Sequence, residues 1–227
     1  MNKNDYINQL KNKYFRLIIL GKSQSGKSYF LKNRVIKNLR EDYDNLVLFT
    51  DEMNRNSYKI EYQPCTIIAK KHDEVLRKMT DKIKQSYVYN ENNEKLYAKN
   101  GDLLRPNNSL FVFDDIFSKK LIKSEIFIEL LCILRHLQIS VIFITQHCEI
   151  ILNRLIKSQS DAFVLMKTSD QYSRNRFIDI IQTALINEYD DKKRKEKAMK
   201  IYNEFVLGKK YGKVIVDLNK NKIYIEF

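Results

Sequence analysis

Eight consecutive residues near the amino terminus have the types and spacing that bind a phosphate chain. They follow the pattern Gly-x-x-x-x-Gly-Lys-Ser and comprise Gly21, Lys22, Ser23, Gln24, Ser25, Gly26, Lys27 and Ser28. Glycines let backbone N–H groups curl around phosphate oxygens, and the helix that follows adds partial positive charge at its amino terminus. In this pattern the lysine reaches the β- and γ-phosphates and the serine hydroxyl ligates Mg²⁺. The sequence therefore predicts a site for ATP and Mg²⁺; the alternative is a glycine turn with a solvated lysine.

Two carboxylates follow an apolar segment later in the chain. Leu110–Phe113 has the composition of a buried strand, and Asp114 and Asp115 come directly after it. In ATPases with such a loop, the first acid holds magnesium and the second orients or deprotonates the attacking water. The pair could instead cap a following helix. A phosphate-binding loop needs an acidic anchor for its metal, so we predict the catalytic roles.

Gln146 and Arg135 are two further candidates. Gln146 follows the apolar segment Val141–Ile144, and the carboxyl end of a parallel strand faces the ligand crevice. We therefore predict that Gln146 contacts the γ-phosphate or the water, although it could simply begin a loop. Arg135 closes a predicted helix, where it either offsets the helix dipole or reaches a neighbouring subunit's nucleotide as an arginine finger. Three other arginines compete for the second role: Arg154, Arg174 and Arg176.

The rest of the chain alternates apolar runs with segments of helical periodicity, which predicts parallel strands joined by helical crossovers. We expect an α/β fold, a three-layer sandwich with a mainly parallel central sheet. Predicted strands are Phe15–Leu20, Leu46–Phe49, Thr66–Ala69, Leu110–Phe113, Val141–Ile144 and Ala162–Met166. Predicted helices are Lys27–Arg40, Asp73–Tyr87, Leu121–Leu137, Gln171–Leu185 and Asp190–Phe205, and Lys213–Leu218 with Lys222–Phe227 predicts a hairpin. The expected division is residues 1–14 as an extension, 15–186 as the core, and 187–227 as a basic helix and hairpin packed on it.

The chain carries a surplus of positive charge. Forty-one Lys and Arg against 28 Asp and Glu give a formal charge of +13, which favours polyanions such as nucleic acid. An AT-rich genome would also enrich lysine. The densest basic stretches supply the predicted DNA contacts: Lys192, Lys193, Arg194, Lys195, Lys209 and Lys210. A mixed-charge helical run is also typical of a solvated face, so that alternative stays open.

Two classes of protein are disfavoured. No apolar run reaches the roughly 18 to 20 residues of a membrane-spanning helix, and the first residues lead into no signal-like stretch. We therefore expect an intracellular protein without a membrane partner. Cys65, Cys132 and Cys148 are odd in number and widely spaced, which argues against a disulfide framework and a zinc site.

Together these residues resemble the FtsK–HerA superfamily of P-loop ATPases, and within it the viral DNA-packaging ATPases of the poxvirus type. The resemblance covers Phe15 to Met166 and rests on the loop Gly21–Ser28, on Asp114 and Asp115, on Arg135 and on Gln146. It implies a ring-shaped homo-oligomer, a hexamer or pentamer, that hydrolyses ATP to thread double-stranded DNA into a viral capsid. It also implies Arg135 as the finger acting in trans, and a location in the host cytoplasm, a viral factory or the virion. Many members have Glu where this chain has Asp115. The residue that activates the water is therefore the position at which this chain departs from the family pattern.

Three other functions share some of these features. A small-molecule or nucleotide kinase has a similar loop and size, but we find no arginine-rich lid. A cellular HerA-like DNA translocase would use the same residues. A nucleotide-gated DNA-binding or assembly factor would bind ATP without useful turnover.

Overall fold

The computed structural model describes residues 6–11, 13–51, 66–68, 71–85, 90–95, 108–116, 125–133, 136–148 and 154–226. The chain forms two compact units. The first unit consists of Met1–Lys11, Arg16–Leu39 and Phe143–Phe227, and the second consists of Asn12–Phe15 and Arg40–Ile142.

The strands of the first unit follow the order β5-β1-β6-β7-β8. Their bounds are β1 Arg16–Leu20, β5 Ile139–Thr145, β6 Ala162–Leu165, β7 Lys213–Asp217 and β8 Lys222–Glu226, of which β5 enters this unit at Phe143. β1 and β6 are parallel, whereas β6–β7 and β7–β8 are antiparallel. Every residue of β1, β6 and β7 is buried, as expected for strands covered on both faces.

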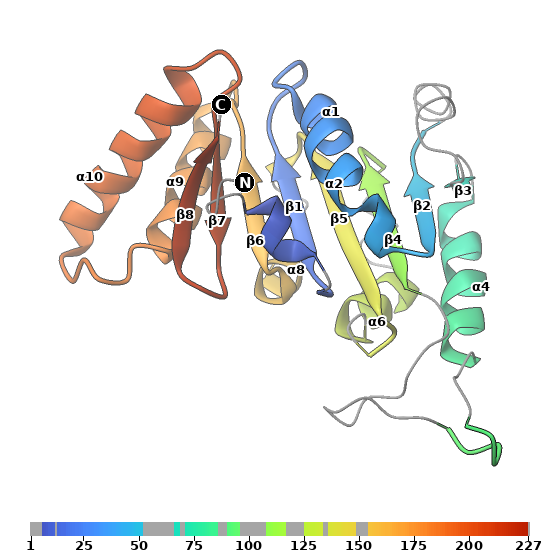
Figure 1. Cartoon of the computed structure of the whole chain (residues 1–227). Helices are drawn as coiled ribbons and strands as arrows, with labels where there is room; N and C mark the ends of the chain where they lie inside the picture. Colours follow the sequence, from blue (N-terminus) through green and yellow to red (C-terminus); the bar gives the residue numbers. More distant parts are fainter. Residues whose placement is uncertain are drawn as a thin grey trace. The chain divides into compact units, whose positions relative to one another are not determined.

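The first unit carries helices on both sides of these strands. α1 (Lys27–Phe30), η2 (Leu31–Ile36) and α2 (Lys37–Leu39) form one uninterrupted helical run. In Figure 1, α1 and α2 lie in front of the strands and α9 lies behind them. The other helices of this unit are η1 (Ile7–Leu10), α8 (Arg154–Gln159), α9 (Gln171–Thr183), α10 (Asp191–Ile201) and η4 (Tyr202–Leu207). The first unit is thus a layered α/β structure.

A buried ion pair fixes the amino end of β1 in this unit. The backbone N–H of Arg16 donates to Oδ2 of Asp161 at 2.8 Å, and Nε of Arg16 lies 3.5 Å from the same oxygen. Nη1 of Arg16 donates to Oε1 of Gln159 at 2.6 Å. Buried charges are tolerated when they are paired and hydrogen-bonded. Arg16 therefore has a structural role at the opposite end of β1 from the phosphate-binding motif.

The second unit is a smaller parallel arrangement in which the strands follow the order β3-β2-β4-β5. β2 pairs in parallel with both β3 and β4. Its elements are η3 (Arg40–Asp42), β2 (Asn45–Phe49), β3 (Thr66–Ile68), α4 (His72–Gln85), β4 (Ser109–Asp114), α6 (Glu125–Ile133) and the first residues of β5. Phe49 stacks on Phe113 with ring centroids 4.6 Å apart, and Phe127 meets Phe113 edge-on at 5.9 Å. These rings pack α6 against the strand that ends in Asp114.

The α/β class and the mainly parallel strands agree with the expectation from the sequence, and each predicted strand has a counterpart. The predicted helix Leu121–Leu137 is wrong at its carboxyl end, because α6 ends at Ile133 and His136–Gln138 forms a turn into β5. Gln138 has a φ of 56°, a left-handed conformation that an α-helix does not contain. The predicted hairpin is present, and its strand β7 continues the sheet beside β6.

Some short helices of the described residues were not predicted, among them α8 and η1. α8 and η1 have too few residues for a helical hydrophobic period to be visible in the sequence.

Among the described residues, no helix combines the length and apolar character that crossing a membrane requires.

Candidate functional site

The predicted phosphate-binding loop follows β1 directly and leads into the helical run that begins at Lys27. Two backbone hydrogen bonds fix its start: the N–H of Gly21 donates to the carbonyl oxygen of Thr145 at 3.4 Å, and that of Lys22 donates to the carbonyl oxygen of Lys167 at 2.8 Å. Thr145 ends β5, and Lys167 follows β6. The loop therefore begins between the carboxyl ends of its two neighbouring strands in the first unit.

The two glycines of the loop are required by its geometry. A Cβ at Gly21 would lie 2.6 Å from Oγ of Ser25 and 2.8 Å from Cβ of Met166, closer than real Cβ contacts. Gly26 has a φ of 95°, where side chains are strained, and Gln24 is also left-handed with a φ of 61°. Alternation of left- and right-handed residues turns successive N–H groups toward one side and makes an anion-binding concavity. The loop has the backbone form that a phosphate chain needs.

Lys27 lies inside this loop. Its side chain is buried, and its Nζ donates to the carbonyl oxygen of Lys22 at 2.9 Å. The ammonium group is therefore held at the concavity by the loop itself. Ser28 is the next residue of the helix and is exposed, so its hydroxyl is accessible to a metal ion. The structure thus places a buried lysine at the loop and an exposed serine next to it in the helix that follows.

Gln146 lies close to the start of the loop. It follows Thr145, whose carbonyl oxygen accepts the hydrogen bond from Gly21, and its side chain is exposed. His147 is held by its backbone N–H, which donates to Oγ1 of Thr145 at 3.1 Å. The structure thus brings Gln146 and the phosphate-binding loop together within the first unit.

Asp114 and Asp115 belong to the second unit, at the end of β4. Asp114 is buried, whereas Asp115 is exposed and has a φ of 51°. A non-glycine residue in this conformation is uncommon, and such positions concentrate at functional sites. Arg135, the predicted finger, lies outside the described residues. The two aspartates therefore have distinct environments, one shielded and one facing solvent.

The proposed metal ligands have suitable chemistry. A serine hydroxyl and a carboxylate, as in Ser28 and Asp114, are the hard oxygen donors that Mg²⁺ prefers, and Mg²⁺ in phosphate sites keeps several waters and takes few protein ligands. Within the described ranges, no group of three or more His, Cys, Asp and Glu side chains could form an all-protein metal cage. Each of the two side chains, within its own unit, is thus chemically suited to Mg²⁺.

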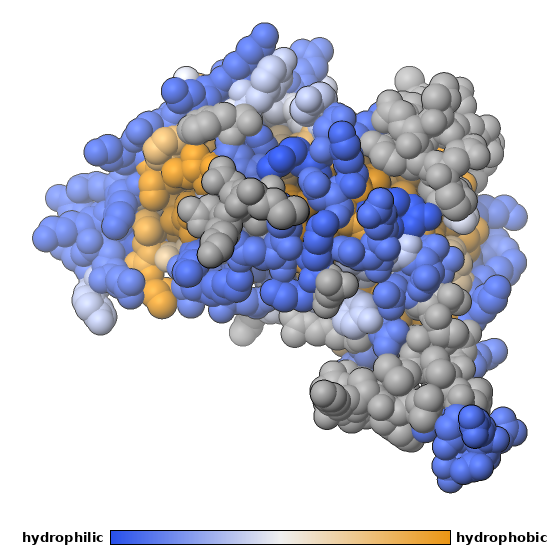
Figure 2. Space-filling model, viewed as in Figure 1, coloured by the Kyte–Doolittle hydropathy of each residue, from blue (hydrophilic) through white to orange (hydrophobic). Residues whose placement is uncertain are grey.

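The two predicted basic stretches lie in different surroundings within the first unit. In α10, Lys192, Lys193 and Lys195 are exposed, and Figure 2 shows hydrophilic residues over this helix at the left of the view. Arg194 is half-buried, and its Nε and Nη2 donate to the carbonyl oxygen of Glu188 at 2.9 and 2.7 Å. Lys209 and Lys210 are exposed at the turn before β7. Arg194 therefore helps to hold α10, while Lys192, Lys193 and Lys195 of the same helix present their charges to solvent.

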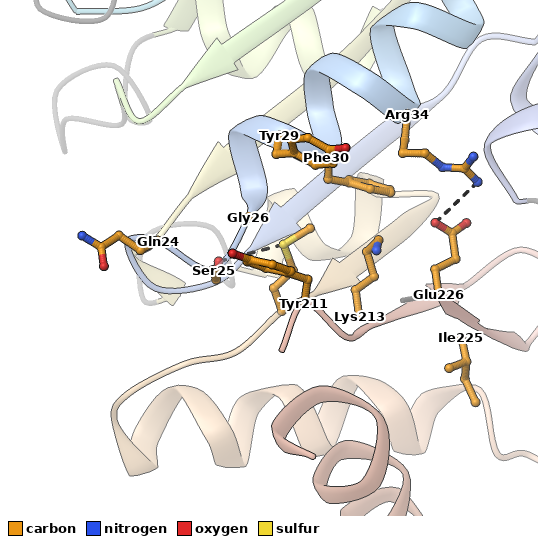
Figure 3. Close-up of a pocket in the computed structure, with 11 residues that line it drawn as sticks. Gln24, Ser25, Gly26, Tyr29, Phe30, Arg34, Tyr211, Lys213, Ile225 and Glu226 are labelled. Carbon is orange, nitrogen blue, oxygen red and sulfur yellow. Dashed lines mark hydrogen bonds and ion pairs between the residues drawn. The ribbon is translucent and has the colours of Figure 1, made fainter. Parts of the chain in front are cut away.

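A cavity of about 980 Å³ adjoins the phosphate-binding loop in the first unit. Figure 3 shows residues of the loop and of its helix on one side, and residues from the β7–β8 region on the other. Tyr29, Tyr211 and Lys213 line it, and none of them was predicted from the sequence to bind the nucleotide. Tyr29 does follow Ser28 directly, but only the fold brings Tyr211 and Lys213 to the loop.

Known structures resemble this fold, two of them across almost its whole length. The genome packaging NTPase B204 of Sulfolobus turreted icosahedral virus 2, in complex with ATP-gammaS, matches with a TM-score of 0.60 and 18% identity over 95% of this chain and 98% of that chain. B204, the DNA-packaging ATPase of Sulfolobus Turreted Icosahedral Virus, matches with a TM-score of 0.59 and 20% identity over 94% and 97%. The conjugation coupling protein TcpA of pCW3 matches with a TM-score of 0.52 and 16% identity over 72% of this chain and 52% of that one. These likenesses show a P-loop NTPase fold.

Sequence comparison gives the family. Comparison with curated protein sequences finds no match. A family model described as "Poxvirus A32 protein" matches residues 2–216, nearly the whole chain and all of the candidate residues. With the phosphate-binding loop and its strand and helix in place, the chain belongs to the poxvirus A32 protein family.

Proposed function

We propose that this protein is an ATPase motor that binds Mg·ATP through Gly21–Ser28 and moves double-stranded DNA during packaging of a viral genome. The observation that carries the proposal is the loop itself. Two left-handed residues, Gln24 and Gly26, shape an anion-binding concavity, and the buried ammonium of Lys27 lies in it at the head of a 13-residue helical run, Lys27–Leu39.

In the proposed reaction, a water oxygen attacks the γ-phosphorus, the bond to the β–γ bridging oxygen breaks, and ADP leaves. Asp115 orients the water and accepts its proton, and Gln146 hydrogen-bonds the same water or the γ-phosphate. Lys27 offsets the charge that develops on the β- and γ-phosphate oxygens. Ser28 and Asp114 would hold a magnesium ion, which when bound would neutralise further phosphate charge.

Arg135 from a neighbouring subunit completes the proposed site. An arginine finger of this kind contributes about 10³- to 10⁵-fold to turnover. This role requires a ring of identical subunits, which we propose to be a hexamer or pentamer. Coupling the finger to the next subunit's nucleotide would link hydrolysis to relative movement of the subunits.

The assignment of DNA and capsid as partners rests on family and charge. The chain belongs to the poxvirus A32 protein family, and the solved structures that share its fold over more than nine-tenths of its length are named as genome packaging enzymes. A formal charge of +13 suits a polyanionic substrate. We accordingly place the protein in the infected cell, at the site of assembly or with the virion, acting on duplex DNA at a capsid.

The decisive experiment measures ATP turnover by purified protein with and without duplex DNA. We expect DNA to stimulate hydrolysis, and Lys27→Ala to reduce turnover by roughly 10²- to 10³-fold, the effect of removing one preorganised electrostatic group. Lys37→Ala is a matched control, because Lys37 is an exposed lysine on the same helical run.

Two outcomes would contradict the proposal. Unchanged ATP turnover in Lys27→Ala would contradict the assignment of the phosphate site. Absence of DNA stimulation at every salt concentration would contradict the assignment as a DNA motor. Phosphoryl transfer from ATP to a nucleoside monophosphate, in place of hydrolysis, would instead identify a kinase.

A further inference from the structure

The cavity beside the phosphate-binding loop is lined by two segments that lie far apart in the sequence. One wall is the loop and the helix that follows it, including Gly26, Tyr29 and Phe30. The other comes from residues more than 180 positions later, including Tyr211 and Lys213 (Figure 3). Its volume of about 980 Å³ is at the upper end of the range of roughly 300 to 1,000 Å³ that is typical of cofactor sites. A small organic group attached to the phosphates would therefore have room to enter.

Two tyrosine side chains that line this cavity have much of their surface exposed to solvent. Tyr29 is 72% exposed and Tyr211 is 54% exposed, although both line the cavity. Tyr211 lies against the loop, since a Cβ placed on Gly26 would be 3.4 Å from its Cδ1. Lys210 covers part of the Tyr211 ring, with its Nζ 5.4 Å from the ring centroid. Exposed aromatic faces next to a phosphate site are suited to stacking on a planar base.

The inner part of the cavity is apolar with a few charged groups. Lys213 is buried with its Nζ 5.3 Å from the centroid of Phe30. Burial lowers the pKa of Lys213, partly opposed by the charge of Glu226. Nη2 of Arg34 lies 3.8 Å from Oε2 of Glu226. Such a wall offers both hydrogen-bond donors and an acceptor to the edge of a base.

The position of the cavity relative to the loop decides which part of a nucleotide it receives. Phosphates bound by the backbone of Gln24–Lys27 occupy the concavity of the loop. The remainder of the nucleotide must leave this concavity on a side that has space, and the cavity begins at Gln24, Ser25 and Gly26. The exposed surfaces of the two tyrosine rings then lie on the side where the base would arrive.

We propose that Tyr211, together with Tyr29, forms the platform on which the nucleobase of the bound nucleoside triphosphate stacks, with Lys213 facing the edge of the base. The carboxyl-terminal segment before β7 is therefore a part of the nucleotide site. This inference rests on the proposed role of Gly21–Ser28 in binding the phosphates. It assigns Tyr211 and Lys213 to nucleotide binding, although the charge of the neighbouring Lys209 and Lys210 suggested contacts with DNA.

Calorimetric titration of the full chain with two ligands tests the platform. ATP carries a base, whereas inorganic tripolyphosphate carries only the charge, and both are titrated in the presence of Mg²⁺. Because stacking on an aromatic side chain contributes roughly 5- to 100-fold to affinity for a base, we expect Tyr211→Ala to weaken ATP binding by such a factor. Its affinity for tripolyphosphate should stay within about 2-fold. Tyr211→Phe retains the ring and should behave as the unaltered protein.

Two control variants separate this inference from the proposed function. Lys27→Ala should weaken ATP and tripolyphosphate alike, and its failure to do so would count against the phosphate site itself. Tyr189→Ala removes a tyrosine that is 92% exposed and lies outside the cavity lining, so it should change neither affinity.

The platform is overturned if Tyr211→Ala and Tyr29→Ala each weaken ATP no more than tripolyphosphate. It is also overturned if Tyr211→Ala leaves ATP binding intact and weakens binding of duplex DNA in the absence of nucleotide. In that case the segment is a DNA contact. Thermal unfolding of each variant checks that the exposed substitutions leave the fold intact.

Discussion

The two basic segments of the first unit have similar composition but different surroundings. α10 presents Lys192, Lys193 and Lys195 to solvent along a helix, away from the lining of any cavity described above. The segment Lys209–Lys213 enters the sheet, and its Tyr211 and Lys213 line the cavity at the phosphate-binding loop. Charge density in a sequence therefore suggests a polyanion, but the elements around the charges decide which one.

Neutralising α10 is expected to give the largest effect that separates the two segments. The triple change Lys192→Gln, Lys193→Gln and Lys195→Gln keeps good helix formers and removes three charges. If these lysines contact phosphates, affinity for duplex DNA should fall about 10- to 100-fold at roughly 0.1 M salt, and the salt dependence should flatten by up to about 3 in slope. Fluorescence anisotropy over a range of salt concentrations measures both quantities.

The matched comparison is the pair Lys209→Gln and Lys210→Gln, for which we expect a smaller loss of DNA affinity. ATP affinity should be unchanged in the α10 triple variant. Equal losses of DNA affinity in the two variants would show that both segments contact DNA to the same extent. No loss in either variant would show that the lysines of α10 form a solvated face that does not bind DNA.

The second prediction concerns Tyr202, which anchors the helical region between the two segments. Its ring meets Phe177 of α9 with centroids 6.0 Å apart, and its hydroxyl accepts a hydrogen bond from the backbone N–H of Thr168 at 3.4 Å. Burial raises the pKa of Tyr202 from 10.0 to about 12. The folded state therefore holds this proton more tightly than the unfolded state.

The free energy of unfolding should consequently fall as the pH rises from about 10 to about 12, because the unfolded chain loses the Tyr202 proton first. Tyr202→Phe cannot ionise and should lose this part of the pH dependence. Urea unfolding at pH 8, 10 and 11 measures the difference. Tyr189→Phe, at an exposed tyrosine, should keep the pH dependence of the unaltered protein; identical curves for Tyr202→Phe and the unaltered protein would contradict the prediction.

The smallest expected effect tests whether α10 acts through its shape or only through its charge. Oδ1 of Asp190 accepts hydrogen bonds from the backbone N–H groups of Lys192 and Lys193 at 2.9 and 3.1 Å, which caps the helix. Asp190→Ala removes this cap and should cost about 1 kcal/mol of local stability. Asp190→Asn removes the same charge but keeps an acceptor.

Both Asp190 variants make the protein more positive by one charge. If an ordered α10 positions its lysines on DNA, Asp190→Ala should bind duplex DNA several-fold more weakly than Asp190→Asn. Circular dichroism should show a small loss of helix in the alanine variant alone. Equal DNA affinities would mean that net charge, and not the helix, governs binding.

Local pattern was sufficient for much of the fold and part of the site. The apolar runs identified β1, β2, β4 and β5 because buried parallel strands are almost uniformly apolar, and the Gly-x-x-x-x-Gly-Lys-Ser spacing identified the loop whose glycines the backbone geometry requires. The family inferred from these motifs is confirmed by the match over residues 2–216. The roles of Asp115, Gln146 and Arg135 stay predictions.

The sequence by itself determined the features that depend on neighbouring residues or on composition. These are a phosphate-binding loop, acidic and amide side chains at strand ends, and a surplus of basic residues. Only the tertiary structure decided which distant segments meet. Pairing of β7 with β6 carries Tyr211 and Lys213 to the loop at Gly26, and no local signal marks that pairing. Hydrophobic periodicity specifies which face of an element is buried, but contacts between residues nearly 200 positions apart depend on how the whole chain packs.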